Sequence, residues 1–332
     1  MHRIVMTVGL ILVVLPLGGC SLWNSVFGSS SSSSSSSGNG GGDFTWADPT
    51  YAEDETALHE LDEGETGMPM YQQAFEADGG YGTPMDDQAN FILRFGTGED
   101  DGMMFVTIET PQGDLTWNDH DHHAVIGAPN NSGVGSAPYT LDFLKFASGN
   151  GQTVFQHAWA YHYDYVAFGH WYEGTASHDD PSHPDFELDH NSFALFYMGL
   201  ETDPNQLPTG SATYTGDVYG DVPGHPQSLH GDLLLTADFA GDAVTGEMTN
   251  MRVWDNGQKD FNDLAYEAGI TGNRFDGTLT AGAAGDPDIS VAEGAEGSVE
   301  GRFFGPEAEE VGGLWLIDDD GHRARGVFGG QR

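Results

Sequence analysis

Two histidine-rich stretches hold the side-chain types that bind divalent metal ions. In the first, His120, His122 and His123 are interleaved with aspartates, and the second lies within residues 178–190. Imidazole and carboxylate groups together are typical ligands of zinc. Neither stretch has the ligand spacing of a known zinc site, and loop-forming residues surround both. We name His120, His122 and His123 as metal candidates, with solvated acidic loops as the favoured alternative.

A row of aromatic side chains could instead bind a partner. At the two-residue period of a strand, Trp159, Tyr161, Tyr163 and Tyr165 share one face. Tyrosine and tryptophan offer a large contact area at low entropy cost, which makes these four the candidate partner-binding residues. The same residue types are good strand formers, and a packed sheet face is the favoured alternative. A further alternative is a haem or metal site that uses Tyr161, His162 and Tyr163.

The charge balance restricts the class of partner. The chain has 332 residues, with 52 acidic and 10 basic side chains and a net charge of −42. Nucleic acid is excluded because phosphate binding needs a basic surface. The acidic charge suits a basic partner or cations, or else solubility in saline surroundings, which we favour. The sequence also lacks a nucleophile elbow, a zinc-protease helix motif and a phosphate-binding glycine loop, so we expect a non-enzymatic protein without a cofactor.

The N-terminus predicts export and a lipid anchor. The apolar run Ile4–Leu17 is shorter than the roughly 20 residues of a spanning helix, so residues 1–19 are expected to be a signal peptide. The run ends before Cys20, the one cysteine of the chain, in a pattern that resembles the lipobox of bacterial lipoproteins. We expect lipidation of Cys20 and, since Ser21 follows, delivery to the outer membrane. Residues 20–43 then form a serine- and glycine-rich tether.

The rest of the chain must position these candidate residues, and its composition favours strands. Glycine is abundant, at 48 residues, and aromatic residues make up 11% of the chain, as expected for a folding chain rich in turns. We expect residues 44–192 to form a β-rich domain whose first part, 44–72, is mainly loop. Its strands are expected at Phe91–Phe95, Met103–Thr110, Tyr139–Phe146 and Thr153–Trp171.

Residues 193–332 alternate apolar and polar residues more regularly and are expected to form a second domain. Eight strands are expected, at 193–200, 211–219, 230–239, 244–253, 274–280, 297–304, 311–317 and 323–328. Glycines alternate with large apolar residues on the same strand face, which suits the filled interior of a small closed barrel. The expected fold class is all-β, with this eight-stranded antiparallel barrel at the C-terminal end.

One stretch near the C-terminus organises the barrel. Gly301–Phe304 ends a strand, Gly305-Pro306 stops it, an acidic turn with three glutamates follows, and Gly312-Gly313 leads into the next strand. This stretch resembles a signature of transferrin-binding-protein-like surface lipoproteins, with further matches at Leu207–Gly216 and Gly326–Gly329. In that family the signature is architectural, so Glu307, Glu309 and Glu310 are not catalytic candidates.

The resemblance implies a fold and a role. The fold would be a β-rich handle-like domain followed by the eight-stranded barrel. The role would be that of a surface-exposed outer-membrane lipoprotein that binds a protein or an iron- or haem-related partner without catalysis. Two alternatives stay open, a lipoprotein that binds haem or a metal ion directly and a structural envelope lipoprotein. We expect the partner to bind the region 44–190, where the longer loops lie, because binding residues gather on loops held by a scaffold.

Overall fold

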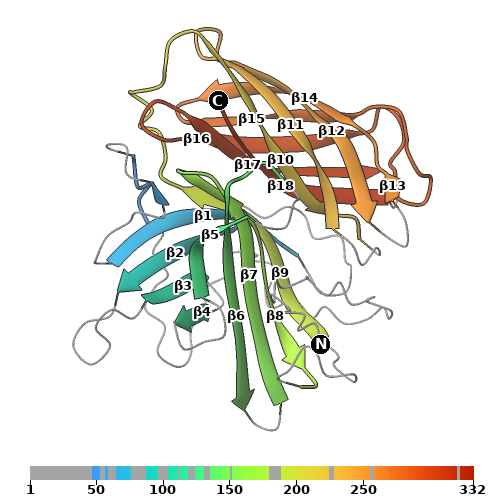
Figure 1. The fold of residues 1–332 in the computed structure, drawn as a ribbon. Coiled ribbons are helices and arrows are strands. Elements are labelled where there is room, and N and C mark those ends of the chain that lie inside the picture. Colours follow the sequence, from blue (N-terminus) through green and yellow to red (C-terminus); the bar gives the residue numbers. More distant parts are fainter. Residues whose placement is uncertain are drawn as a thin grey trace, which may run out of the picture.

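The structure is a computed structural model, and it is built almost wholly from strands (Figure 1). It describes residues 47–52, 57–58, 65–75, 87–95, 104–110, 113–118, 124–130, 135–149, 152–178, 188–223, 228–254, 258–319 and 322–332. Within these ranges, no helix has the length and hydropathy needed to cross a membrane.

The first half of the chain forms one open antiparallel sheet of nine strands. The strands are β1 (Glu65–Phe75), β2 (Asp87–Phe95), β3 (Met104–Thr110), β4 (Gly113–Asn118), β5 (Ala124–Pro129), β6 (Tyr139–Gly149), β7 (Gln152–His162), β8 (Val166–Ala176) and β9 (Leu188–Gly199). Their order is β4-β3-β2-β1-β9-β8-β7-β6-β5. The sheet curls, because Trp117 of β4 packs against Phe143 of β6 with ring centroids 5.9 Å apart.

The structure corrects two expectations for this sheet. The last part of the segment 44–72 is a strand and not loop, because β1 begins at Glu65 and pairs with both β2 and β9. The expected single strand Thr153–Trp171 is two strands, β7 and β8, which fold back on each other at Tyr163–Tyr165. Aromatic residues favour strands by their size and shape, so the sequence pattern alone did not reveal this turn.

The second half of the chain forms a closed eight-stranded barrel, as expected. Its strands are β10 (Ser211–Asp221), β11 (Ser228–Asp238), β12 (Ala243–Trp254), β14 (Leu264–Thr271), β15 (Arg274–Ala281), β16 (Glu296–Phe304), β17 (Glu310–Asp319) and β18 (His322–Gln331). Neighbours pair antiparallel around the ring, and the pairing of β11 with β12 closes it. The short strand β13 (Gln258–Asp260) adds to β12 outside the ring.

The number of barrel strands is right, but one assignment is wrong. The segment 193–200 belongs to β9 and pairs with β8 and β1 in the N-terminal sheet. The strand that the sequence analysis missed is β14, whose pattern is weak because it contains alanine, glycine and glutamate and buries mainly Leu264 and Tyr266. A run that is apolar on both faces, as in β9, fits a strand covered on both sides better than a barrel wall.

The barrel interior is filled by side chains. Large buried aromatic residues meet there, and the Phe303 ring packs against the Phe275 ring with centroids 5.5 Å apart. Glycine is required opposite these rings, since a Cβ added at Gly301 would lie 2.4 Å from the Phe275 ring. Phe303 therefore points into the barrel, and this barrel is a packed core of the kind expected for eight strands.

Candidate binding surface and the seam that supports it

The predicted aromatic row lies mostly inside the molecule. Tyr161, Tyr163 and Tyr165 are buried, and Trp159 is half-buried, with its ring 5.7 Å from that of Tyr219 on β10. This placement matches the packed sheet face that the sequence analysis favoured. It leaves Trp159 as the member of the row with partly exposed surface for a partner.

The predicted metal candidates, His120, His122 and His123, lie outside the described residues, as does Cys20. Among the side chains that the structure does describe, no three histidine, cysteine or acidic groups come together in a way that could hold a metal ion. The haem candidates are engaged locally, because Nδ1 of His162 lies 2.6 Å from the carbonyl oxygen of Tyr163 and the His162 ring stacks on Tyr139.

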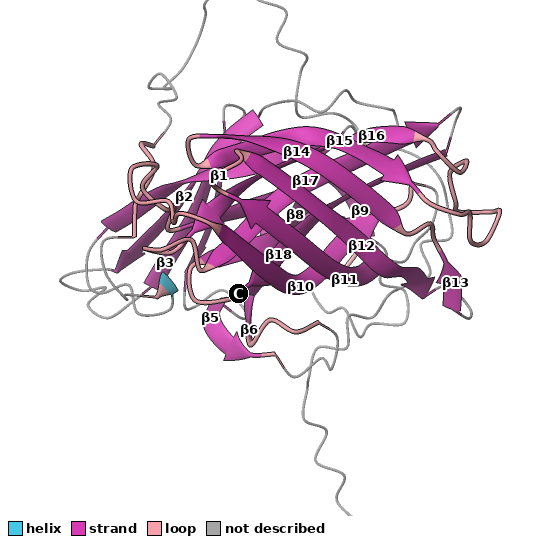
Figure 2. Ribbon diagram, turned by 90° about the horizontal axis from the view of Figure 1, so that it is seen from above, coloured by secondary structure: helices cyan, strands magenta, loops and turns pink. Residues whose placement is uncertain are grey.

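The N-terminal sheet and the barrel meet along an extensive contact that we call the seam. It is formed by β8, β9 and the turn Tyr163–Tyr165 on one side and by β17, β18 and the end of β16 on the other. Figure 2 shows β17 and β18 lying across β8 and β9. The barrel contributes Phe304, Leu314 and Val327 to the hydrophobic core of the sheet.

Two glycines on the outer wall of the barrel permit this close approach. A Cβ at Gly329 would lie 2.2 Å from the Phe168 ring, and a Cβ at Gly312 would lie 2.7 Å from a methyl group of Val166. Any larger side chain at these positions would have to push the sheet away from the barrel. Gly312 of the C-terminal signature therefore allows the sheet to approach the barrel closely, in addition to its place in the strand.

Glu310 is the polar anchor at the centre of the seam. It stands at the start of β17, is 3% exposed, and accepts three hydrogen bonds from the turn of the opposite sheet. The backbone N–H of Asp164 donates to Oε1 over 2.9 Å, and those of Tyr165 and Val166 donate to Oε2 over 2.8 Å. Burial raises the pKa of Glu310 to about 8, although the three N–H donors favour the charged form and oppose that shift.

Asp217 of β10 anchors a loop of the N-terminal domain in the same way. Its carboxylate accepts hydrogen bonds from the backbone N–H of Ser136 over 2.7 Å and of Ala137 over 3.0 Å. The Tyr163 hydroxyl donates to it over 3.0 Å. Burial and the nearby carboxylate raise the pKa of Tyr163 far above its ordinary value, so this phenol stays neutral and acts as a donor. Tyr163 thus has a structural role at the seam.

Glu201 joins the two domains at a third place, in the linker after β9. Its Oε1 accepts a hydrogen bond of 2.5 Å from the Tyr71 hydroxyl on β1. Its Oε2 accepts one of 3.0 Å from Asn273 of the barrel, and Arg302 lies 3.4 Å away. The Arg302 guanidinium also lies over the Tyr71 ring, 4.2 Å from its centroid. A buried carboxylate is costly unless it is paired, and here the partners come from both domains.

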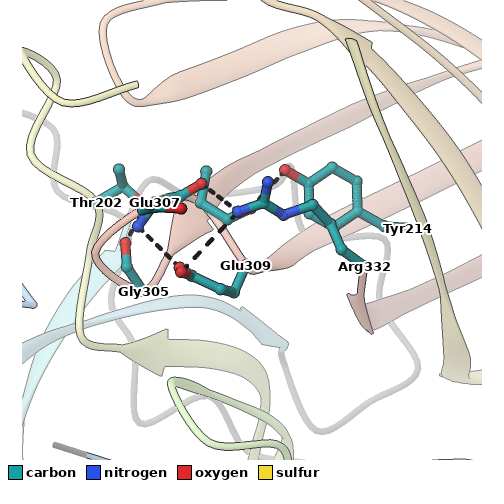
Figure 3. A network of polar contacts seen from close by, with 7 residues as sticks. Thr202, Tyr214, Gly305, Glu307, Glu309 and Arg332 are labelled. Atoms are coloured by element: carbon teal, nitrogen blue, oxygen red, sulfur yellow. Dashed lines mark hydrogen bonds and ion pairs between the residues drawn. The ribbon is translucent and has the colours of Figure 1, made fainter. Parts of the chain in front are cut away.

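The acidic turn after β16 is held by a separate network, drawn in Figure 3. Thr202 of the linker donates to the carbonyl oxygen of Gly305 over 2.6 Å, and the Glu309 side chain accepts the N–H of Glu307 over 2.8 Å. The Tyr214 hydroxyl donates to the carbonyl oxygen of Ala308 over 2.7 Å, and Arg332 donates to that of Glu307. The turn has positive φ at Gly305 and Ala308. These contacts give the glutamates the architectural role expected of the signature.

Histidine and aromatic rings gather between the long strands of the sheet and the edge of the barrel. Nε2 of His157 lies 3.0 Å from Asp142, and the His170 ring stacks on Tyr219 at 5.3 Å. Burial lowers the pKa of His230 on β11 to about 4, so that this imidazole is neutral near pH 7. The cluster packs the two domains together, because Tyr219 of β10 contacts His170 of β8 and His230 of β11.

Comparison with known proteins relates the second domain to one family. Residues 207–332 match the family model described as the C-lobe and N-lobe beta barrels of Tf-binding protein B. The chain is 29% identical over 151 residues to the neisserial heparin binding antigen of Neisseria meningitidis, a match that covers 44% of this chain and 27% of that protein. It is 32% identical over 103 residues to transferrin-binding protein B of Haemophilus influenzae, covering 29% and 16% of the two chains. The chain thus spans well under half the length of these relatives.

The chain can also be aligned with solved structures at low sequence identity. The chain aligns with intact Ap-TbpB (N and C lobes) at 17% identity and a TM-score of 0.40, covering 81% of this chain and 60% of that one. It aligns with isotype 1 transferrin binding protein B of serogroup B Neisseria meningitidis at 19% identity and a TM-score of 0.38, covering 80% and 57%.

Proposed function

We propose that this chain, a transferrin-binding-protein-like protein by its C-terminal barrel, is a surface-exposed lipoprotein that captures a protein partner without catalysis. The observation that carries the proposal is the family match over residues 207–332, which coincides with the closed barrel. Relatives with this barrel are named for binding transferrin or heparin. The partner is an iron- or haem-related protein or another extracellular protein.

The packed barrel supports capture on the outside of the molecule. Eight strands leave an interior that side chains fill, and rings such as Phe275 and Phe303 occupy it. The three buried carboxylates of the seam hold the two domains in one orientation. A rigid scaffold of this kind lowers the entropy cost of binding a partner through its exterior.

Localisation follows from the predicted anchor. A lipidated Cys20 and a tether over residues 20–43 would place the folded domains outside the outer membrane. Proteinase treatment of whole cells tests this placement: a surface protein should be degraded while a periplasmic control survives. If the protein survives intact in cells that exclude the proteinase, the structural envelope alternative replaces the proposal.

A pull-down tests the capture itself. The mature chain with Cys20→Ser is immobilised and exposed to extracellular fluid from the environment of the organism, beside an unrelated acidic β-barrel protein as a control for charge. We expect a protein to be retained by this chain and to be absent from the control. Recovery of the same proteins on both supports would mean that charge alone explains the binding.

Haemin reconstitution separates the rival in which the chain carries haem directly. In this rival the iron ligand comes from Tyr161, His162 and Tyr163 or from the histidine-rich stretches. Two of the first three residues are buried tyrosines, and Tyr163 already donates a hydrogen bond to Asp217. We therefore expect no Soret band to survive gel filtration. A stable band that is lost in a Tyr161→Phe variant would support the haem-carrying rival.

A further inference from the structure

The barrel has one wall that faces away from the seam, and this wall is hollowed. It consists of β11, β12, β14 and β15, which lie opposite β17 and β18 in the ring (Figure 1). The hollow has a volume of about 480 Å³. It opens on the outer surface, so that a partner can reach it without any change in the barrel.

The side chains of the hollow combine one apolar contact with two carboxylates. Leu234 is 44% exposed, unusually high for a large apolar residue of this protein. Strand register places it beside Glu247, which in turn pairs with Ala265. Glu267 lies two residues along β14 from Ala265 and pairs with Thr245, so that Glu247 and Glu267 are diagonal neighbours, roughly 7–8 Å apart. Leu234 thus lies beside a pair of carboxylates with a threonine between them.

Nothing in the described part of the chain neutralises these carboxylates. Glu247 and Glu267 form no hydrogen bond or ion pair with any described residue, and no lysine or arginine lines the hollow. The cations on this side of the ring have other partners. Arg274 of β15 pairs with Glu300 at 2.9 Å, and Lys259 of β13 pairs with Asp288 at 3.2 Å. Nε of Arg252 on β12 donates to the carbonyl oxygen of Asn250 over 3.1 Å. The chain has 10 basic side chains and 52 acidic ones, so few cations are available to neutralise this wall.

We propose that this wall is a docking surface for a basic segment of the protein partner. A lysine or arginine side chain would lay its aliphatic stem on Leu234 and place its charged end between Glu247 and Glu267. Threonines of the neighbouring strands, such as Thr236 and Thr278, would accept or donate hydrogen bonds at the rim. The inference rests on the proposed function and moves the contact from the expected region 44–190 to the barrel.

A peptide titration of the mature Cys20→Ser chain tests the surface. The probe is an octapeptide of alternating lysine and alanine, with glutamate in place of lysine as the negative peptide, at 0.15 M salt, where the Debye length is about 8 Å. We expect Glu247→Gln/Glu267→Gln to weaken binding of the lysine peptide by roughly three- to thirtyfold, because each exposed pair contributes up to about a factor of five. Leu234→Ser should weaken it by about threefold or more.

The matched control is Asp48→Asn/Glu293→Gln, which removes the same charge from exposed positions that do not line the hollow. We expect this variant to bind as the parent does. Equal weakening in both double variants, or no effect in either, would overturn the proposal. Partner capture then separates two failures: a parent chain that captures no protein refutes the proposed function, whereas equal capture by parent and Glu247→Gln/Glu267→Gln refutes this surface alone.

Discussion

At the scale of single residues, Glu310 differs from Glu307 and Glu309 in its burial and in its hydrogen-bond partners. Glu307 is exposed and Glu309 is partly exposed, whereas Glu310 is buried and bonds three backbone N–H groups of the other domain. The sequence assigned all three an architectural role but did not separate them. The difference arises because the N-terminal sheet packs against the barrel at Glu310, and the local sequence pattern does not predict this contact.

Glu310→Ala should therefore destabilise the protein strongly. It leaves two buried N–H groups and one partly buried N–H group without an acceptor. Each buried group costs about 1–3 kcal/mol, so we expect a loss of about 2 kcal/mol or more in the free energy of unfolding. Urea denaturation measures it. The matched change Glu309→Ala should cost less than about 1 kcal/mol, because its hydrogen bond from the Glu307 N–H is exposed to solvent and its contact with Arg332 is 4.0 Å. Similar losses in the two variants would refute the special role of Glu310.

The pH dependence of stability gives a second test of the same residue. Burial raises the pKa of Glu310 from 4.5 to about 8, so the folded protein holds this proton more tightly than the unfolded chain does. Its contribution to stability is fully present below about pH 4.5 and is lost as the pH rises through 8. The stability of the parent relative to Glu310→Gln should thus fall between pH 5 and pH 9. A constant or rising difference in urea denaturation would contradict the raised pKa.

At the scale of elements, the outer wall of β17 and β18 is shaped for the sheet that covers it. Gly312 and Gly329 pair across the two strands and face β8. The next pair on the same face, Leu314 and Val327, joins the core of the sheet. Both strands are therefore buried on both faces. Strands of this kind lose the alternation that marks a half-exposed wall.

Gly329→Ala should loosen the seam. The added Cβ would lie 2.2 Å from the Phe168 ring, and overpacking of this kind typically costs about 1–3 kcal/mol. Gly269→Ala on β14 is the matched control, because nothing lies within 4 Å of its Cβ position. Thermal unfolding of both variants measures the difference. A Gly329→Ala protein as stable as the Gly269→Ala protein would mean that the two domains are not in close contact there.

The sequence predicted much of the barrel at this scale and less of the sheet. Alternation and hairpin turns identified seven of the barrel strands. The alternation is clearest where one face is exposed and the other packed, as in β11 and β15. The strand β14 escaped because small and acidic residues weaken its pattern. The turn at Tyr163–Tyr165 escaped because its tyrosines read as strand, and their burial follows from contacts with Asp217 and Glu310 that lie far away in the chain.

At the scale of the whole molecule, the predicted lipid anchor decides where the two domains act. Cys20 precedes the expected tether in the sequence, so we predict that Cys20→Ser releases the protein from the membrane fraction without changing its melting temperature. Fractionation of cells that express each form measures this. Sedimentation of the variant with membranes would contradict lipidation at Cys20, and a lowered melting temperature would show that the residue has a structural role.

The sheet and the barrel form one rigid unit, joined at the seam by Glu201, Asp217 and Glu310. Calorimetry of the mature Cys20→Ser chain tests this most directly, because strongly coupled domains unfold together. We predict one heat-absorption peak for the parent chain and two separated peaks, or one that is markedly broadened, for Glu310→Ala/Asp217→Ala. Two resolved peaks in the parent chain would contradict the claim and mean that the domains fold and move independently.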